Sequence, residues 1–135
     1  MKGDDGQVLA PAVFMPAAER YQMMPVIDRW VIRNSLHFLG KRWKHIEAAG
    51  PVFCINLSGQ SLTNTGFYAF VRDELRESKL PPANICFEIT ETAAISNIDD
   101  AIALMDALRS IGCRFSLDDF GAGLSSFGYL KRLPV

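Results

Sequence analysis

The sequence predicts an α/β fold in which parallel strands alternate with helices. Three short runs rich in branched and aromatic residues, 52–58, 85–90 and 114–120, turn polar near their C-terminal ends. Such runs are typical of strands that are buried in a parallel sheet. Segments with helical spacing of apolar residues lie before and between them, and alternation of strands and helices gives a parallel sheet with right-handed crossovers.

The spacing of the strand runs sets the scale of the fold. Asn56 and Glu88 are 32 residues apart, and Glu88 and Asp118 are 30 residues apart, which is the length of one βα unit. Closing a barrel of eight such units takes about 250 residues, and the chain has 135. The sequence therefore predicts either a small open sheet or a partial (β/α)₈ TIM-like barrel, roughly half of one.

Helices are expected around these strands. Pro25 suits a first helical turn, and apolar residues on one stripe follow it, while Gly40 weakens the pattern further on. A second helix follows Thr65, and a third follows Asn97, which is a favourable capping residue. Segment 127–132 is expected to form a last short helix. The stripes consist of Ile27, Trp30, Val31 and Phe38; of Phe67, Phe70, Val71 and Leu75; and of Ile98, Ile102, Met105 and Leu108.

Composition and charge exclude several classes of protein. The formal net charge of −1 gives no electrostatic basis for binding DNA or an anionic membrane. Three cysteines without CxxC spacing predict buried free thiols rather than a zinc site or redox pair. No apolar run approaches the roughly 20 residues that cross a bilayer, and the N-terminus lacks the pattern of a signal peptide. We expect a cytoplasmic location, with no direct membrane contact from this segment.

Polar side chains recur where the predicted strands end. Asn56, Glu88 and Asp118 lie near the C-terminal ends of successive strands, where parallel sheets and barrels carry their active sites. Amide and carboxylate oxygens suit Mg²⁺ or Mn²⁺ rather than zinc or copper. A bound dication would also offset the repulsion between Asp118 and Asp119. The alternative for each residue alone is a helix cap or an ion pair with arginine.

Two further features leave alternatives open. Glu91, just past the second strand, holds a neighbouring loop through backbone N–H groups, or is a solvated loop charge. His37 and His45 lie eight residues apart without partner ligands in the sequence, which predicts surface or hydrogen-bonded histidines. The glycine-rich turn at 121–126 allows a sharp bend close to a ligand, but Ser126 stands where a dinucleotide fingerprint needs glycine.

Four segments together resemble the EAL-domain family, the cyclic di-GMP phosphodiesterases. They occur in the family's order and cover nearly all of the chain. They are FMPAAERYQMMPVIDRWVI (14–32), FCINLSGQSL (53–62), CFEITETAAI (86–95) and RFSLDDFGAGLSSFGYLKRLPV (114–135).

The resemblance implies a modified (β/α)₈ barrel that binds Mg²⁺ or Mn²⁺ and hydrolyses cyclic di-GMP to linear pGpG. Asn56 resembles the family's asparagine metal ligand, and Glu88 and Asp118 resemble its acidic ligands. Asp119 is similar to the aspartate that serves a second metal and the attacking water. Glu91 is similar to the glutamate that fixes the loop after strand five, here 121–126. We expect a homodimer through that loop or through exposed half-barrel edges.

Departures from the family pattern shape the expected activity. Residues 1–135 read as an incomplete EAL domain without the N-terminal signature strand and the C-terminal half of the barrel, which carries a catalytic lysine. Ala122 stands where threonine is usual, and Gln22 where glycine is common. We expect phosphodiesterase activity in the parent domain and none in the isolated fragment. The alternatives are a degenerate module that binds cyclic di-GMP or a protein partner without catalysis, and a unit of folding or association only.

Overall fold

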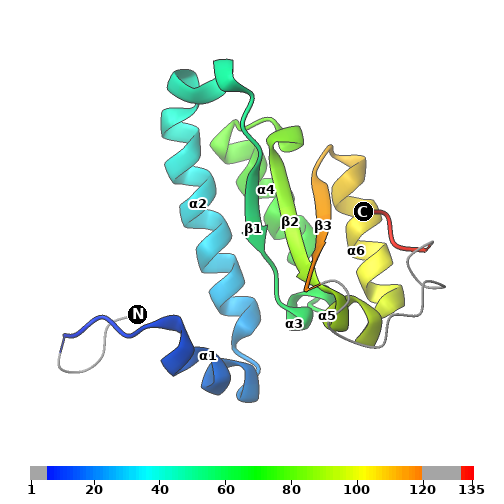
Figure 1. The fold of residues 1–135 in the computed structure, drawn as a ribbon. Helices are drawn as coiled ribbons and strands as arrows, with labels where there is room; N and C mark the ends of the chain where they lie inside the picture. Colours follow the sequence, from blue (N-terminus) through cyan, green and yellow to red (C-terminus); the bar gives the residue numbers. More distant parts are fainter. Residues whose placement is uncertain (1–5, 120–131) are drawn as a thin grey trace.

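A computed structural model of the chain describes residues 6–119 and 132–135. Within them, three strands form one parallel sheet with the order β1-β2-β3 (Figure 1). The strands are β1 (Phe53–Asn56), β2 (Ile85–Thr90) and β3 (Arg114–Asp118). The predicted parallel α/β architecture is confirmed. Run 85–90 coincides with β2, whereas the other two strands end earlier than their runs.

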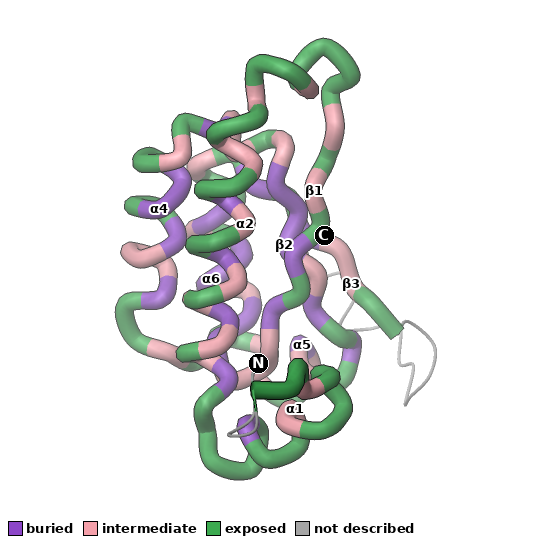
Figure 2. Tube along the Cα trace, turned by 90° about the vertical axis from the view of Figure 1, so that its left-hand side faces the viewer, coloured by how far each residue is buried: buried purple, intermediate pink, exposed green. Residues whose placement is uncertain are grey.

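Helices α2, α4 and α6 pack together on one side of the sheet (Figure 2). Shorter helices precede α2 or follow the strand ends. The helices are α1 (Pro11–Arg20), α2 (Met24–Ile46), α3 (Gly59–Leu62), α4 (Phe67–Ser78), α5 (Glu91–Ser96) and α6 (Ile98–Ser110), and the 3₁₀ turns are η1 (Glu47–Ala49) and η2 (Pro82–Asn84). None of these helices is long and apolar enough to cross a membrane.

The hydrophobic core lies between the sheet and these helices. Because the strands pair without offset, odd-numbered strand residues point toward the helices and even-numbered ones toward the opposite face. Phe87 and Phe115 stack at 5.7 Å between ring centroids within this core. Burying each such side chain contributes about 1.5–3 kcal/mol. Further core residues are Ile32, Leu36, Ile55, Val71, Leu75, Ile89, Met105 and Leu108.

Helix α2 buries a different stripe from the predicted one. Trp30 and Phe38, which belong to the predicted apolar stripe, are 66% and 55% exposed. The buried row contains the charged Asp28, which an apolar pattern does not include, and its hydrogen bonds are what make its burial possible. This row is Met24, Asp28, Ile32 and Leu36.

Gly40 does not end α2. It lies inside the helix, where it permits close packing against α4. A Cβ atom at residue 40 would lie 2.5 Å from the Ser78 carbonyl oxygen. Glycine therefore lets the two helices approach where a side chain would collide. The helix continues to Ile46, through the stretch that the sequence left uncertain.

Several local expectations need correction. Helix α1 was not predicted, and it carries Pro11 in its first turn and Pro16 inside it. Asn97 precedes α6 but makes no capping hydrogen bond with its side chain. Cys86 and Cys113 are buried as predicted, whereas Cys54 is exposed because it lies on edge strand β1 and on the face without helices. The predicted helix at 127–132 falls almost wholly outside the described residues.

Candidate metal centre at the strand ends

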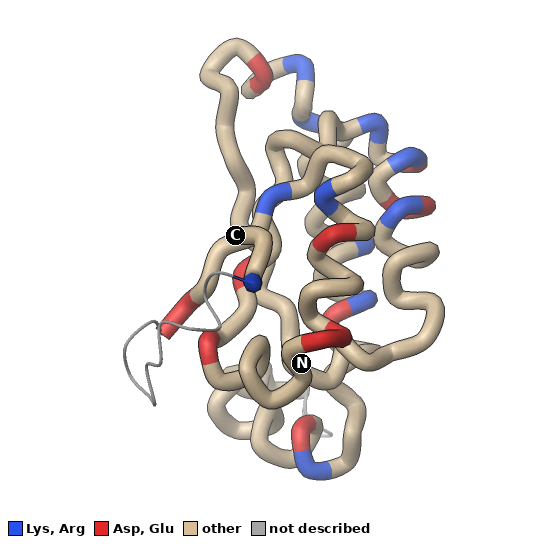
Figure 3. Tube along the Cα trace, turned by 90° about the vertical axis from the view of Figure 1, so that its right-hand side faces the viewer, with Lys and Arg blue, Asp and Glu red and all other residues tan. Residues whose placement is uncertain are grey.

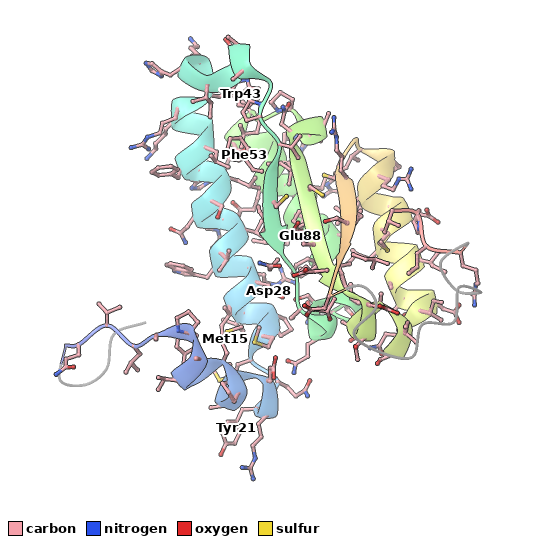
Figure 4. All side chains as sticks on the ribbon, in the orientation of Figure 1. Met15, Tyr21, Asp28, Trp43, Phe53 and Glu88 are labelled. Atoms are coloured by element: carbon pink, nitrogen blue, oxygen red, sulfur yellow. The ribbon has the colours of Figure 1, made fainter. Side chains whose placement is uncertain are left out.

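Asn56 and Glu88 face each other across neighbouring strands. They are register partners on β1 and β2, and both lie on the face of the sheet opposite the helices. Neighbouring strands are about 4.8 Å apart, so the two side chains are adjacent. Asn56 is exposed at the end of β1, and Glu88 is half-buried. Figure 4 shows Glu88 on the central strand β2.

The third strand orients Glu88. Ser116 is the register partner of Glu88 on β3, and its hydroxyl donates to Glu88 Oε1 at 3.2 Å. Cys54 lies on the same face of β1. Although Cys54 is exposed, desolvation by the surrounding protein, together with a hydrogen bond and the negative charge of Glu88, raises the pKa of its thiol above the ordinary value. A carboxylate held by a hydroxyl and facing an amide side chain is suited to coordinating a cation.

Asp118 shares this face but lies further along the sheet. It pairs with Thr90, two residues beyond Ser116, which places it about 7 Å further along the strand direction. Its Oδ1 accepts a hydrogen bond from the Asp119 backbone N–H at 2.8 Å. Asp119 adopts a left-handed conformation with φ 54°, which aspartate tolerates better than most residues. The strand ends here, and Asp119 follows it.

The structure thus gathers the predicted residues in part. Asn56, Glu88 and Asp118 lie on one face at one end of the sheet, with Asp119 just beyond. Among the described residues, Glu88, Asp118 and Asp119 do not belong to a group of three potential ligands within 4.8 Å of one another. Their hard oxygen donors, three of them exposed, fit Mg²⁺ or Mn²⁺ in chemical type. The individual roles remain predictions.

The basic positions, more than the acidic ones, are distributed unevenly along the molecule. Lys and Arg positions lie mainly toward the end of the molecule where the strands begin, whereas acidic positions lie at both ends, including the end where the strands finish (Figure 3). Basic positions are therefore sparser where the strands finish, which is compatible with a divalent cation there.

Glu91 is the first residue of α5 and is only 3% exposed. Thr90 caps this helix, since its hydroxyl accepts from the Ala93 N–H at 3.3 Å. Burial of Glu91 rules out the solvated loop charge that the sequence left open. The loop that Glu91 is expected to hold, 121–126, lies outside the described residues.

Asp28 is a positioning residue that the sequence analysis missed. It is 5% exposed and reaches from α2 to the segment after β1 (Figure 4). Its Oδ2 accepts three hydrogen bonds: from the Ser58 N–H at 3.0 Å, the Ser58 hydroxyl at 2.6 Å and the Ser61 hydroxyl at 2.6 Å. This network fixes the chain two residues after Asn56. A lone aspartate within the apolar stretch VIDRWVI was the available signal.

Comparison with known proteins identifies the family. The model of the EAL domain matches residues 1–135. The chain belongs to the EAL domain family. It is 41% identical over 133 residues to the cyclic di-GMP phosphodiesterase PdeB of Shewanella oneidensis, which covers 96% of this chain and 15% of that protein. It is 32% identical to the cyclic di-GMP phosphodiesterase PdeF of Escherichia coli, over 98% of this chain and 18% of that protein.

Solved EAL domains have the same architecture. The FimX EAL domain from Pseudomonas aeruginosa bound to c-di-GMP aligns with a TM-score of 0.85 and 31% identity, over 98% of this chain and 52% of that one. The PaMucR phosphodiesterase in complex with c-di-GMP aligns with a TM-score of 0.83 and 31% identity, over 94% of this chain and 54% of that one. Because EAL domains are TIM-barrel-like, the partial-barrel alternative is confirmed over the small open sheet. The chain spans about half of these solved chains.

Proposed function

We propose that this EAL domain, within the protein that carries it, binds cyclic di-GMP and hydrolyses one phosphodiester bond to give linear pGpG. The observation that carries the proposal is the facing pair Asn56 and Glu88 at the strand ends. The 41% identity to PdeB across 96% of this chain supports it. We further propose a cytoplasmic domain that forms a homodimer.

The proposed cofactor is Mg²⁺ or Mn²⁺, held by Asn56, Glu88 and Asp118, with Asp119 serving a second ion. When bound, such ions stabilise charge on phosphate oxygens and lower the pKa of a coordinated water. Ser116 orients the Glu88 carboxylate through its hydrogen bond to Oε1. Asp119, at the strand end, orients the attacking water. Glu91 is buried at the start of α5, and the role we propose for it is to hold the loop at 121–126.

A binding module without catalysis is the second candidate. Ala122 replaces the threonine that is usual in the family's loop motif, and the FimX EAL domain is a structural relative described as bound to c-di-GMP. In this case the strand-end residues recognise the nucleotide and turnover is absent.

Hydrolysis assays on the purified protein that carries this chain separate the two candidates. Cyclic di-GMP is incubated with Mg²⁺ or Mn²⁺ and pGpG is quantified by chromatography. We expect turnover that EDTA abolishes, and a loss of about 10³-fold in Glu88→Gln. Glu47→Gln, an exposed glutamate in η1, is the matched control and retains activity.

Each outcome has a clear meaning. Binding of cyclic di-GMP without pGpG formation would favour the binding module. Unchanged turnover in Glu88→Gln would remove Glu88 from the metal centre. The isolated chain of 135 residues is expected to give no product, and hydrolysis by it would contradict that part of the proposal.

A further inference from the structure

A second cluster of potential ligands lies between α2 and α4, outside the strand-end site. His37 on α2 faces Glu74 and Glu77 on α4. Its Nε2 is 3.5 Å from Glu74 Oε2 and 3.7 Å from Glu77 Oε2. The three ligand atoms all lie within 4.8 Å of one another, the one such group of His, Cys, Asp and Glu side chains in the described ranges.

The packing of the two helices creates this cluster. Glu74 and Glu77 are three residues apart, so they lie on the same face of α4. His37 lies one turn before Gly40, which permits the close approach of α2 to Ser78, the residue after Glu77. A pocket of about 330 Å³ opens there, lined by His37, Gly40, Lys41, Glu77 and Ser78. The cluster is therefore partly accessible to a small ion.

One carboxylate oxygen in the cluster lacks a partner. The Glu74 side chain is only 6% exposed, and its Oε1 accepts from Arg33 Nε at 2.6 Å. Its Oε2 is buried and has no hydrogen-bond partner among the described residues, although it points toward the His37 ring nitrogen. Buried carboxylate oxygens are normally satisfied, because leaving one unpaired is destabilising. This atom therefore indicates a missing partner.

A metal ion satisfies this arrangement better than a proton does. A single N–H on His37 Nε2 can donate a good hydrogen bond to only one carboxylate oxygen. Two carboxylate oxygens lie near this nitrogen. Ligands of a tetrahedral ion with bonds of about 2.0–2.1 Å lie about 3.3 Å apart, close to the observed 3.5 and 3.7 Å. Arg33, which bonds Oε1, and Lys41, on the pocket wall, oppose a cation. Among the described contacts, neither side chain binds Glu74 Oε2 or Glu77 Oε2.

We propose that His37, Glu74 and Glu77 form a binding site for a divalent transition metal such as Zn²⁺, which links α2 to α4 and is separate from the strand-end site. Imidazole together with carboxylate suits Zn²⁺ and its neighbours, unlike the all-oxygen set at the strand ends. Water would complete the coordination. The inference does not depend on the proposed hydrolysis of cyclic di-GMP.

Calorimetric titration with ZnCl₂ tests the site in the protein that carries this chain, under reducing conditions and with excess Mg²⁺ present. The variants are His37→Gln and Glu77→Gln, whose side chains are 44% and 74% exposed and therefore tolerant of change. The matched controls are His45→Gln and Glu47→Gln, exposed residues at the end of α2 and in η1. Circular dichroism checks that each variant is folded.

The expected result is specific to the cluster. Wild type and both controls bind one more equivalent of Zn²⁺ than His37→Gln does, and Glu77→Gln binds that equivalent more than about tenfold more weakly. Zinc raises the Tm of the wild type and the controls more than that of His37→Gln. Equal stoichiometry and affinity in wild type and His37→Gln would overturn the proposal, and so would the absence of zinc binding in the wild type.

Discussion

Asn56 on β1 and Glu88 on β2 are direct register partners, and both point away from the helices. A parallel ladder without offset places an amide and a carboxylate side by side at the open end of the sheet. The Ser116 hydroxyl holds Glu88 from the third strand. Sheet register, rather than loop conformation, therefore fixes the first two predicted ligands.

Asp28 is expected to stabilise the segment that follows Asn56. Asp28→Ala removes the acceptor of three hydrogen bonds, and we expect the free energy of unfolding to fall by about 2–4 kcal/mol. Asp28→Asn retains an oxygen acceptor and should lose less. Urea unfolding measures both. Asp99→Ala, which breaks an exposed pair with Arg132, is the control and should change stability by about 1 kcal/mol or less. A loss no larger than that in Asp28→Ala would contradict this role.

Gly40→Ala is expected to destabilise the protein although alanine favours helices. The new Cβ would lie 2.5 Å from the Ser78 carbonyl oxygen, so α2 and α4 must separate. We expect a net loss of about 1–3 kcal/mol, against a helix-propensity gain of about 1 kcal/mol. Thermal unfolding measures the sign. Lys44→Ala, at an exposed site of the same helix, should be nearly neutral. A raised Tm in Gly40→Ala would contradict this, because it would show that α2 and α4 accommodate the added methyl group without separating.

Cys113 is expected to make stability fall at alkaline pH. Burial raises the pKa of its thiol to about 12, from 9.0 in the unfolded chain. The contribution of the neutral Cys113 thiol to the free energy of unfolding is fully present below pH 9, because the thiol is neutral in both the folded and the unfolded state. It is lost as pH rises from 9 toward 12, because only the unfolded state releases the proton. The slope reaches at most about 1.4 kcal/mol per pH unit.

The difference between wild type and Cys113→Ala isolates this contribution from other groups that titrate at high pH. Denaturant unfolding at pH 8, 9.5 and 11 should show the wild type losing stability faster than the variant. Parallel losses across this range would mean that the Cys113 thiol ionises as easily in the folded protein as in the unfolded chain.

Much of the fold could be predicted from local sequence. The run 85–90 matched β2 because this central strand is mostly buried and rich in branched and aromatic residues. The predicted strand at 114–120 extends past the end of β3 at Asp118, because composition does not reveal the left-handed backbone at Asp119. Trp30 and Phe38 belong to the predicted apolar stripe but are exposed, because an apolar pattern does not show which side of α2 meets the sheet.

The site was predictable in its position and less so in its contacts. The spacing of the strand runs and their polar ends led to Asn56, Glu88 and Asp118, but not to the position of Asp118 two residues further along the sheet than Ser116, the partner of Glu88. Asp28 and Ser58 are 30 residues apart, and His37 and Glu74 are 37 apart. Contacts across such distances depend on helix packing, so the sequence indicated neither the buried network of Asp28 nor the partners of His37.

Binding of Mn²⁺ to the protein that carries this chain, followed by the electron paramagnetic resonance signal of free Mn²⁺, tests the strand-end centre most directly. Glu88→Gln and Asn56→Ala should each weaken Mn²⁺ binding by more than about tenfold, while Glu47→Gln binds like the wild type. If both strand-end variants hold Mn²⁺ as tightly as the wild type, the register pair at residues 56 and 88 is not a metal site.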